Sequence, residues 1–220
     1  MSSMEPLKLT YFEFQGPAEA IRLALTIGKI PFTDEVIPFE TWKTSKPLAS
    51  PWGQLPYLTL PSGEVFGQSH AMLTYVGRLT SLLPPSPLEA LTCESFVQYI
   101  NQDLRDRKIS STMRIKNDAE KIEARKQLND FTLPEMLDSL ISKIPSSGYV
   151  CLGRLTVADL SLYTFLNWVG SNVLDGIDGR RIIKERERLV VFMEMMEGVE
   201  GVREWNLEKR KGKLPIDFRS

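Results

Sequence analysis

LKLTYFEFQGPAEAIRLALTIG, residues 7–28, places a short β-prone run directly before a helical pattern. The run Leu7–Phe12 is apolar and favours a strand, whereas Ala18–Gly28 carries Ile21 and Leu25 at helical spacing and ends on a glycine. This stretch therefore predicts a strand followed by a helix.

The pattern continues downstream. An extended pattern at 32–39 follows a proline, and 56–68 contains two β-prone runs joined by a Pro-Ser-Gly turn. A second helical pattern covers 69–80. The order strand, helix, strand, strand, strand, helix predicts a small α/β layer of about 80 residues.

The composition changes after this layer. Residues 82–90 hold three prolines, which predict a semi-rigid linker instead of a continuous helix. The residues beyond are mostly helix formers with few strand signals. We therefore expect an α/β plus all-α protein, with an α/β domain at 1–82, a linker at 83–91 and an all-helical domain at 92–220.

Charge narrows the choice of partners. The 220 residues carry 27 Lys and Arg against 28 Asp and Glu, which gives a net charge of −1. Such a balance provides no overall field for phosphate backbones or acidic lipid, so we expect neither a nucleic-acid nor a membrane partner. The sequence shows no signal-like start and no apolar run of about 20 residues, and we expect a cytoplasmic protein.

Metal chemistry is not expected. The chain has two cysteines, Cys93 and Cys151, and one histidine, His70. These residues cannot form a Cys/His zinc constellation, so we expect no metal. In a cytoplasmic protein both thiols would be reduced.

Four separated motifs occur in order: Tyr11 before a loop and an Ala-Glu-x-Ile-Arg helix, Gln-Leu-Pro at 54–56, Gln-Ser at 68–69, and Thr-Val-Ala-Asp-Leu at 156–160. Together they resemble the cytosolic glutathione transferases of the sigma-like, tyrosine-type classes. The resemblance covers the first 80 residues closely and the helical part mainly through the last motif. It implies a thioredoxin-like N-terminal domain, a C-terminal helical bundle and a homodimer.

Tyr11 is the catalytic candidate. The matching hydroxyl in the resembling family donates a hydrogen bond to the glutathione sulfur. A free thiol with a pKa of about 8.5 is mostly protonated at neutral pH, and stabilising its thiolate by about 1.4 kcal/mol lowers that pKa by about one unit. Without the family context, a tyrosine on a strand is more often a packing residue.

The resemblance also implies how glutathione is held. In the family the proline after Leu55 is cis, and the residue before that proline pairs its main chain with the cysteinyl part of the tripeptide. The γ-glutamyl carboxylate would meet the Gln-Ser pair at a helix N-terminus, although ordinary capping explains the serine equally well. The implied glutathione-binding set is Trp42, Lys46, Gln54, Leu55, Pro56, Gln68, Ser69 and Asp103.

Some of these assignments have competitors. Trp42 and Lys46 lie in what we expect to be an irregular stretch, 40–50, and would contact the glycyl end of glutathione. Lys43 competes with Lys46 for this task. Asp103 would reach across a dimer to the glutathione amine and lies on the same helix face as Asp106.

Trp52, in the loop before the Gln-Leu-Pro motif, would pack either into the partner subunit or within its own domain. The electrophile should be a hydrophobic molecule held between the early loop and the helical domain. Aromatic and methionine residues at helical spacing are more often core residues. The candidates for the wall of this acceptor pocket are Phe12, Phe14, Arg105, Met113 and Phe165.

One motif departs from the family. Gln15-Gly16-Pro17 replaces the usual Arg-Gly-Arg, whose second arginine helps stabilise the thiolate. We therefore expect a modest transferase that conjugates glutathione to electrophiles, with a higher thiol pKa than arginine-bearing relatives. The alternatives are a glutathione-dependent isomerase of prostaglandin type and a non-catalytic glutathione- or ligand-binding protein of the same fold.

Overall fold

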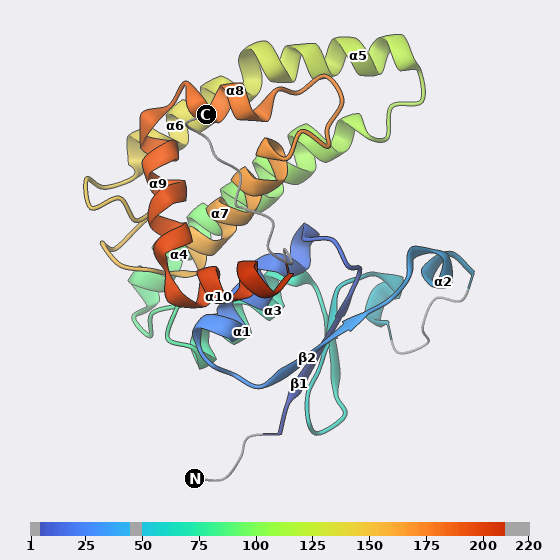
Figure 1. Cartoon of the computed structure of the whole chain (residues 1–220), viewed down its shortest axis with the longest axis vertical. Coiled ribbons are helices and arrows are strands. Elements are labelled where there is room, and N and C mark those ends of the chain that lie inside the picture. Colours follow the sequence, from blue (N-terminus) through green and yellow to red (C-terminus); the bar gives the residue numbers. More distant parts are fainter. Residues whose placement is uncertain (1–4, 45–49, 210–220) are drawn as a thin grey trace. The chain divides into compact units, whose positions relative to one another are not determined.

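The computed structural model describes residues 5–44 and 50–209, and the chain forms two compact units, Met1–Pro85 and Ser86–Ser220. Unit 1 contains the α/β layer, and unit 2 is helical (Figure 1). The predicted fold class, an α/β layer followed by an all-helical part, is confirmed. Among the described residues, no helix combines the length and the apolar character that crossing a bilayer requires.

The described part of unit 1 contains a four-stranded mixed sheet with the spatial order β2-β1-β3-β4. β1 runs parallel to β2 and antiparallel to β3, and β3 is antiparallel to β4. The strands are β1 (Leu7–Tyr11), β2 (Phe32–Val36), β3 (Tyr57–Thr59) and β4 (Val65–Gly67).

Two longer helices complete this layer. α1 (Glu19–Ile27) packs against α3 (Ser69–Leu79), and short 3₁₀ turns lie at Gly16–Ala18 and Pro51–Gly53. The sequence placed both helices correctly. It missed the six-residue helix α2 (Phe39–Thr44), which occupies the start of the stretch expected to be irregular.

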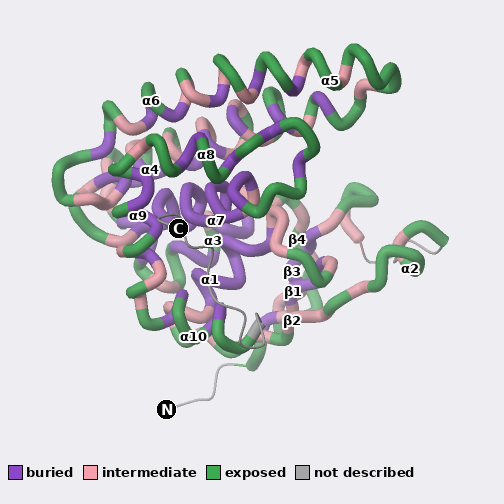
Figure 2. The backbone as a smooth tube through the Cα atoms, turned by 45° about the horizontal axis from the view of Figure 1, so that its top comes forward, coloured by how far each residue is buried: buried purple, intermediate pink, exposed green. Residues whose placement is uncertain are grey.

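Unit 2 is built around a buried helix. α7 (Val157–Gly170) is buried over nearly its whole length (Figure 2), because other helices pack on it. Its buried residues are mostly apolar but include Asp159, Ser161, Thr164 and Asn167. The remaining helical segments are α4 (Pro87–Gln98), a π-type segment at Tyr99–Ser110, α5 (Asp118–Gln127), a short π-type segment at Leu128–Thr132, α6 (Leu133–Lys143), α8 (Gly179–Lys184), α9 (Glu187–Gly198) and α10 (Glu200–Lys209).

The stretch expected to be a linker, 83–91, is partly helical. α4 begins at Pro87, so the third proline of the cluster is the first residue of the helix. Proline is well suited to this position because its missing N–H would have no partner in the first turn and its φ angle already matches a helix. The predicted linker is therefore too long, because residues 87–91 belong to α4.

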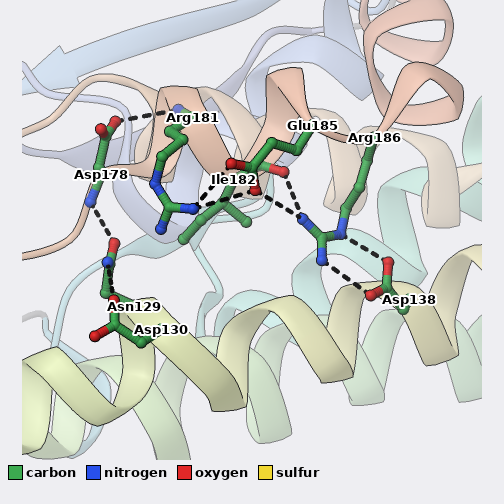
Figure 3. A network of polar contacts seen from close by, with 8 residues as sticks. All are labelled: Asn129, Asp130, Asp138, Asp178, Arg181, Ile182, Glu185 and Arg186. Carbon is green, nitrogen blue, oxygen red and sulfur yellow. Dashed lines mark hydrogen bonds and ion pairs between the residues drawn. The ribbon is translucent and has the colours of Figure 1, made fainter.

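Within unit 2, a polar network connects the residues at both ends of α8 to α6 and to the short π-type segment before it (Figure 3). Asp178 caps α8 by accepting from the Arg181 N–H at 3.1 Å, and its own N–H donates to the Asn129 side chain at 2.7 Å. At the other end of α8, Arg186 donates to both carboxylate oxygens of Asp138, at 2.7 and 2.9 Å. Such bidentate pairs add geometric specificity to packing.

The N-terminus of α7 carries a buried capping box. Thr156 and Asp159 cap each other: the Thr156 N–H donates to Asp159 at 2.8 Å, and the Thr156 hydroxyl accepts from the Ala158 N–H. The Asp159 carboxylate also accepts from the Val150 N–H at 2.8 Å. Burial nevertheless raises the Asp159 pKa from its ordinary 3.8 to about 6, because desolvation outweighs these hydrogen bonds.

This shift makes the stability of the protein depend on pH. A raised carboxyl pKa stabilises the folded state fully below pH 3.8, and this contribution disappears as the pH rises through about 6. Because Asp159→Asn cannot titrate, we expect its free-energy gap to the wild type to shrink by on the order of 3 kcal/mol between pH 4 and pH 7. Urea unfolding at several pH values measures this gap. Asp118→Asn, at a 90% exposed side chain, should show no such trend, and a constant gap for Asp159→Asn would contradict the account.

Candidate active site

The sheet register brings three of the predicted motifs to one end of unit 1. β1 ends at Tyr11, one residue after Thr10, which pairs with Tyr57 of β3. Tyr57 also pairs with Gly67, the last residue of β4. The end of β1, the Gln-Leu-Pro motif before β3 and the Gln-Ser motif after β4 therefore lie next to one another.

Tyr11 is held in a largely buried position. Its side chain is 5% exposed, and its ring lies 5.2 Å from the Phe12 ring and 5.4 Å from the Phe14 ring, measured between centroids. The Arg22 guanidinium carbon lies 5.7 Å from the centroid of the Tyr11 ring. The phenol is therefore enclosed by the loop that follows it and by a side chain of α1.

Gly16 limits where the Tyr11 hydroxyl can lie, a role that the sequence analysis did not predict. Its φ angle is +47°, in the left-handed region that favours glycine. A Cβ atom at this position would lie 2.4 Å from the Tyr11 hydroxyl oxygen. The backbone of the loop therefore approaches the phenol as closely as a glycine allows.

The Leu55–Pro56 peptide bond is cis, as the resemblance implied. Pro56 is buried, and Leu55 is partly exposed at the same end of the sheet as Tyr11. Leu55 lies two residues before Tyr57, which pairs with Thr10 beside Tyr11.

Gln54 and Gln68 come together at the start of α3. The Gln68 Nε2 donates to the Gln54 Oε1 at 3.3 Å, and both side chains are exposed. Gln68, not Ser69, occupies the N-cap position, with a φ angle of 69°, and no side-chain hydrogen bond caps this helix among the described residues. The alternative prediction that Ser69 serves as an ordinary helix cap is therefore wrong. The helix N-terminus retains N–H groups that can meet an anion.

An aromatic cluster, defined here as Phe12, Phe14, Phe39 and Trp42, borders Tyr11. Phe12 stacks on Phe14 at 5.2 Å, and it also lies 5.6 Å from Phe39 and 6.4 Å from Trp42. Phe14 and Phe39 are more than half exposed. Exposed aromatic rings grouped in this way can bind an apolar molecule.

Of the two lysines that compete for the glycyl end of glutathione, only Lys43 lies among the described residues. The Lys43 ammonium lies 3.6 Å from the Glu40 carboxylate and 5.1 Å from the centre of the Phe39 ring, so its charge has local partners on α2. Lys46 lies outside the described residues. Trp42, which the sequence placed in an irregular stretch, is on α2 instead.

The remaining candidates belong to unit 2. Asp103 forms an ion pair with Arg107 on the segment Tyr99–Ser110, and Met113 is 48% exposed. Arg105 is partly exposed on the same segment as Asp103. Phe165 is fully buried in α7 with its ring against Trp168. It is a core residue of unit 2, which corrects its predicted place in the wall of the acceptor pocket.

Among residues 5–44 and 50–209, no group of three or more His, Cys, Asp or Glu side chains could hold a metal ion. Cys93 and Cys151 are both buried free thiols, 3.2 Å apart at sulfur. His70, partly buried in the first turn of α3, follows the Gln-Ser motif directly. The chemistry suggested by the described residues therefore centres on a phenol hydroxyl, backbone groups and a helix N-terminus.

Known proteins provide an independent comparison. Residues 102–210 match the family model described as "Glutathione S-transferase, C-terminal domain". A glutathione S-transferase of Anopheles gambiae is 31% identical over 168 residues, covering 76% of this chain and 80% of the relative. Glutathione S-transferase 1 of Ascaris suum is 27% identical over 214 residues, covering 94% of this chain and 98% of the relative.

Solved structures agree with these relatives. The structure of prostaglandin synthase D of Nilaparvata lugens has a TM-score of 0.82 and 27% identity, and the match covers 96% of this chain and all of that one. The fold is therefore that of a two-unit protein with an α/β layer followed by a helical part. The chain belongs to the glutathione S-transferase family.

The contact between Gly16 and Tyr11 can be tested by adding one methyl group. In Gly16→Ala the new Cβ would displace the Tyr11 hydroxyl or the loop, and we expect glutathione conjugation to fall by about 10-fold to 100-fold. Gly63→Ala is the matched control, since Gly63 also has a positive φ angle but no heavy atom lies within 4 Å of its added Cβ.

Both variants should lose roughly 1–2 kcal/mol of stability from the left-handed backbone, whereas only Gly16→Ala should lose activity. Thermal unfolding and initial rates of conjugation separate the two effects. Equal activity in both variants would show that Gly16 does not constrain the Tyr11 hydroxyl.

Proposed function

We propose that this chain is a sigma-like glutathione transferase that binds glutathione in unit 1 and transfers its thiolate to a hydrophobic electrophile. The observation that supports this most directly is the grouping of Tyr11, Leu55–Pro56 and the N-terminus of α3 at one end of the sheet. Family membership makes transferase chemistry the first expectation for such a group.

Glutathione binding would divide among three places. The γ-glutamyl carboxylate would meet the N–H groups of α3 at Ser69 beside Gln68, where the positive end of the helix dipole favours an anion. The cysteinyl part would pair with the main chain of Leu55. Trp42 and Lys46 would hold the glycyl end, with the lysine ammonium opposite the second carboxylate.

The chemistry would be thiolate stabilisation followed by nucleophilic attack. The glutathione S–H releases its proton to water, and the Tyr11 hydroxyl donates a hydrogen bond to the resulting thiolate. The sulfur then forms a bond to the electrophilic carbon while the leaving group departs with its electron pair. A hydrogen bond to a charged group contributes about 1.5–3 kcal/mol, which corresponds to about one to two units of thiol pKa.

The electrophile would lie against Phe12 and Phe14 of unit 1. Phe14 is 57% exposed, which leaves an apolar surface beside Tyr11. Because Phe165 is buried in its own unit, we leave it out of this proposed wall.

We also propose a cytoplasmic homodimer. Trp52, 80% exposed with a φ angle of 60°, is an indole on the surface that could anchor a partner subunit. Asp103 would complete the partner's site at the glutathione amine, in competition with its own pairing to Arg107. A monomer would then have an incomplete site.

A second function has one specific observation in its favour. The similar structure from Nilaparvata lugens is described as a prostaglandin synthase D. A glutathione-dependent isomerase would use the same thiolate but release glutathione unchanged. A screen of aryl halides and prostaglandin endoperoxides, with products identified, separates the two activities.

The assignment of Tyr11 is tested by Tyr11→Phe. Removing the hydroxyl should lower kcat for an aryl halide by about 100-fold while leaving glutathione affinity within about threefold, because the ligand's peptide contacts lie elsewhere. Tyr75→Phe, at an exposed tyrosine on α3, is the control and should behave as wild type. Unchanged kcat in Tyr11→Phe would overturn the catalytic assignment, and binding without turnover in either protein would support the non-catalytic alternative.

The missing arginine pattern at Gln15 and Pro17 makes a second prediction. With the tyrosine hydrogen bond alone, the pKa of the bound glutathione thiol should fall from about 8.5 to about 7, and not further. Ultraviolet absorbance of the thiolate, measured against pH in the binary complex, gives this value. A bound-thiol pKa well below 7 would mean that another cation has taken over the task.

A further inference from the structure

Arg22 carries a buried charge that is bonded to other residues of unit 1. Its side chain is only 2% exposed, its Nε donates to Asp34 at 2.9 Å, and its Nη1 donates to Glu19 at 3.1 Å. A buried guanidinium is tolerated only when it is paired and hydrogen-bonded. Two carboxylates, from α1 and β2, therefore anchor this side chain.

The same guanidinium also holds the loop after β1. Its Nη2 donates to the Phe12 carbonyl at 2.9 Å, and its Nη1 donates to the Phe14 carbonyl at 3.1 Å. The guanidinium is a rigid planar fork, so two carbonyls bound to it are fixed relative to each other and to α1. A lysine could not satisfy both carbonyls while facing both carboxylates.

This loop in turn limits the position of the Tyr11 hydroxyl. Two residues after Phe14 the chain reaches Gly16, where an added Cβ would lie 2.4 Å from the Tyr11 hydroxyl oxygen. Arg22 itself lies against the Tyr11 ring, with 5.7 Å between the guanidinium carbon and the ring centroid. The phenol is thus confined between Arg22 and the loop that Arg22 holds.

A direct electrostatic effect on the thiolate is disfavoured. Glu19 and Asp34 place two negative charges within hydrogen-bonding distance of one positive charge, so little positive field remains to act beyond the cluster. Arg22 cannot replace the cations that are missing at Gln15 and Pro17 in this way. Arg22 can therefore influence the reaction only by positioning other groups.

We propose that Arg22 is a positioning residue that sets the place of the Tyr11 hydroxyl by binding the carbonyls of Phe12 and Phe14. This inference rests on the proposed function, because it requires Tyr11 to donate to the glutathione sulfur. Arg22 would thus contribute to thiol activation without contacting glutathione.

The test uses Arg22→Lys, which keeps the positive charge but removes the planar guanidinium that donates to both carbonyls. We expect the pKa of bound glutathione to rise by about 0.5–1 unit and kcat to fall by about tenfold, with KM for glutathione within about threefold. Thiolate absorbance and steady-state rates give these values. The matched control is Arg125→Lys in unit 2, another buried arginine, bonded to the Asp175 carbonyl at 3.0 Å. It should lose stability without changing the thiol pKa.

A double variant separates positioning from a general structural role. If Arg22 acts through Tyr11, Arg22→Lys should cause no further rise in thiol pKa when added to Tyr11→Phe. The same rise in both backgrounds would overturn the inference, as would a wild-type pKa and kcat in Arg22→Lys. If Tyr11→Phe itself leaves the thiol pKa unchanged, the proposed role of Tyr11 is wrong, and the inference about Arg22 is rejected with it.

Asp34→Asn keeps the inference testable if Arg22→Lys does not fold. Weakening the Nε anchor should loosen the guanidinium from both carbonyls and raise the thiol pKa, by less than Arg22→Lys. A direct field from the less neutralised Arg22 would instead lower the thiol pKa, so the sign of the change decides. A lowered or unchanged pKa in this variant would contradict positioning.

Discussion

The buried guanidinium of Arg22 is the constraint on which the first unit depends. It must find acceptors for a charge that has almost no contact with water, and the structure supplies them from three places: Glu19 in the first turn of α1, Asp34 in β2 and two carbonyls of the loop after β1. Breaking a buried pair of this kind typically costs about 3–5 kcal/mol, because the partner is left charged and buried. The interaction that joins helix, strand and loop also encloses Tyr11, so stability and the candidate active site share one set of contacts.

The second unit is organised differently. Its centre is α7, which is buried over nearly its whole length and whose N-terminus is fixed by the buried Thr156–Asp159 capping box. This capping box fixes the start of α7, and we give it no part in catalysis. In our account the glutathione-binding chemistry therefore falls mainly to unit 1.

The sequence predicted the element order because short β-prone runs, turn residues and helical spacing of apolar residues mark the elements of unit 1. It missed α2, because six residues after Pro38 are too few to show helical periodicity. It extended the linker too far, because proline breaks a helix interior but begins a helix well, as Pro87 does. The motif residues 11, 54–56 and 68–69 meet through sheet register. Arg22 and Gly16 could not be recognised, since an arginine in a helical pattern is usually exposed and a glycine usually marks only a turn.

The central claim is that the Tyr11 hydroxyl, confined by the loop at Gly16, is the group that meets the glutathione sulfur. A crystal structure of the protein with bound glutathione tests this most directly. The account predicts the sulfur within hydrogen-bonding distance of the Tyr11 hydroxyl, the cysteinyl backbone paired with Leu55, and the Arg22 contacts to the Phe12 and Phe14 carbonyls intact. A sulfur that lies away from Tyr11 and receives its hydrogen bond from another donor would contradict it.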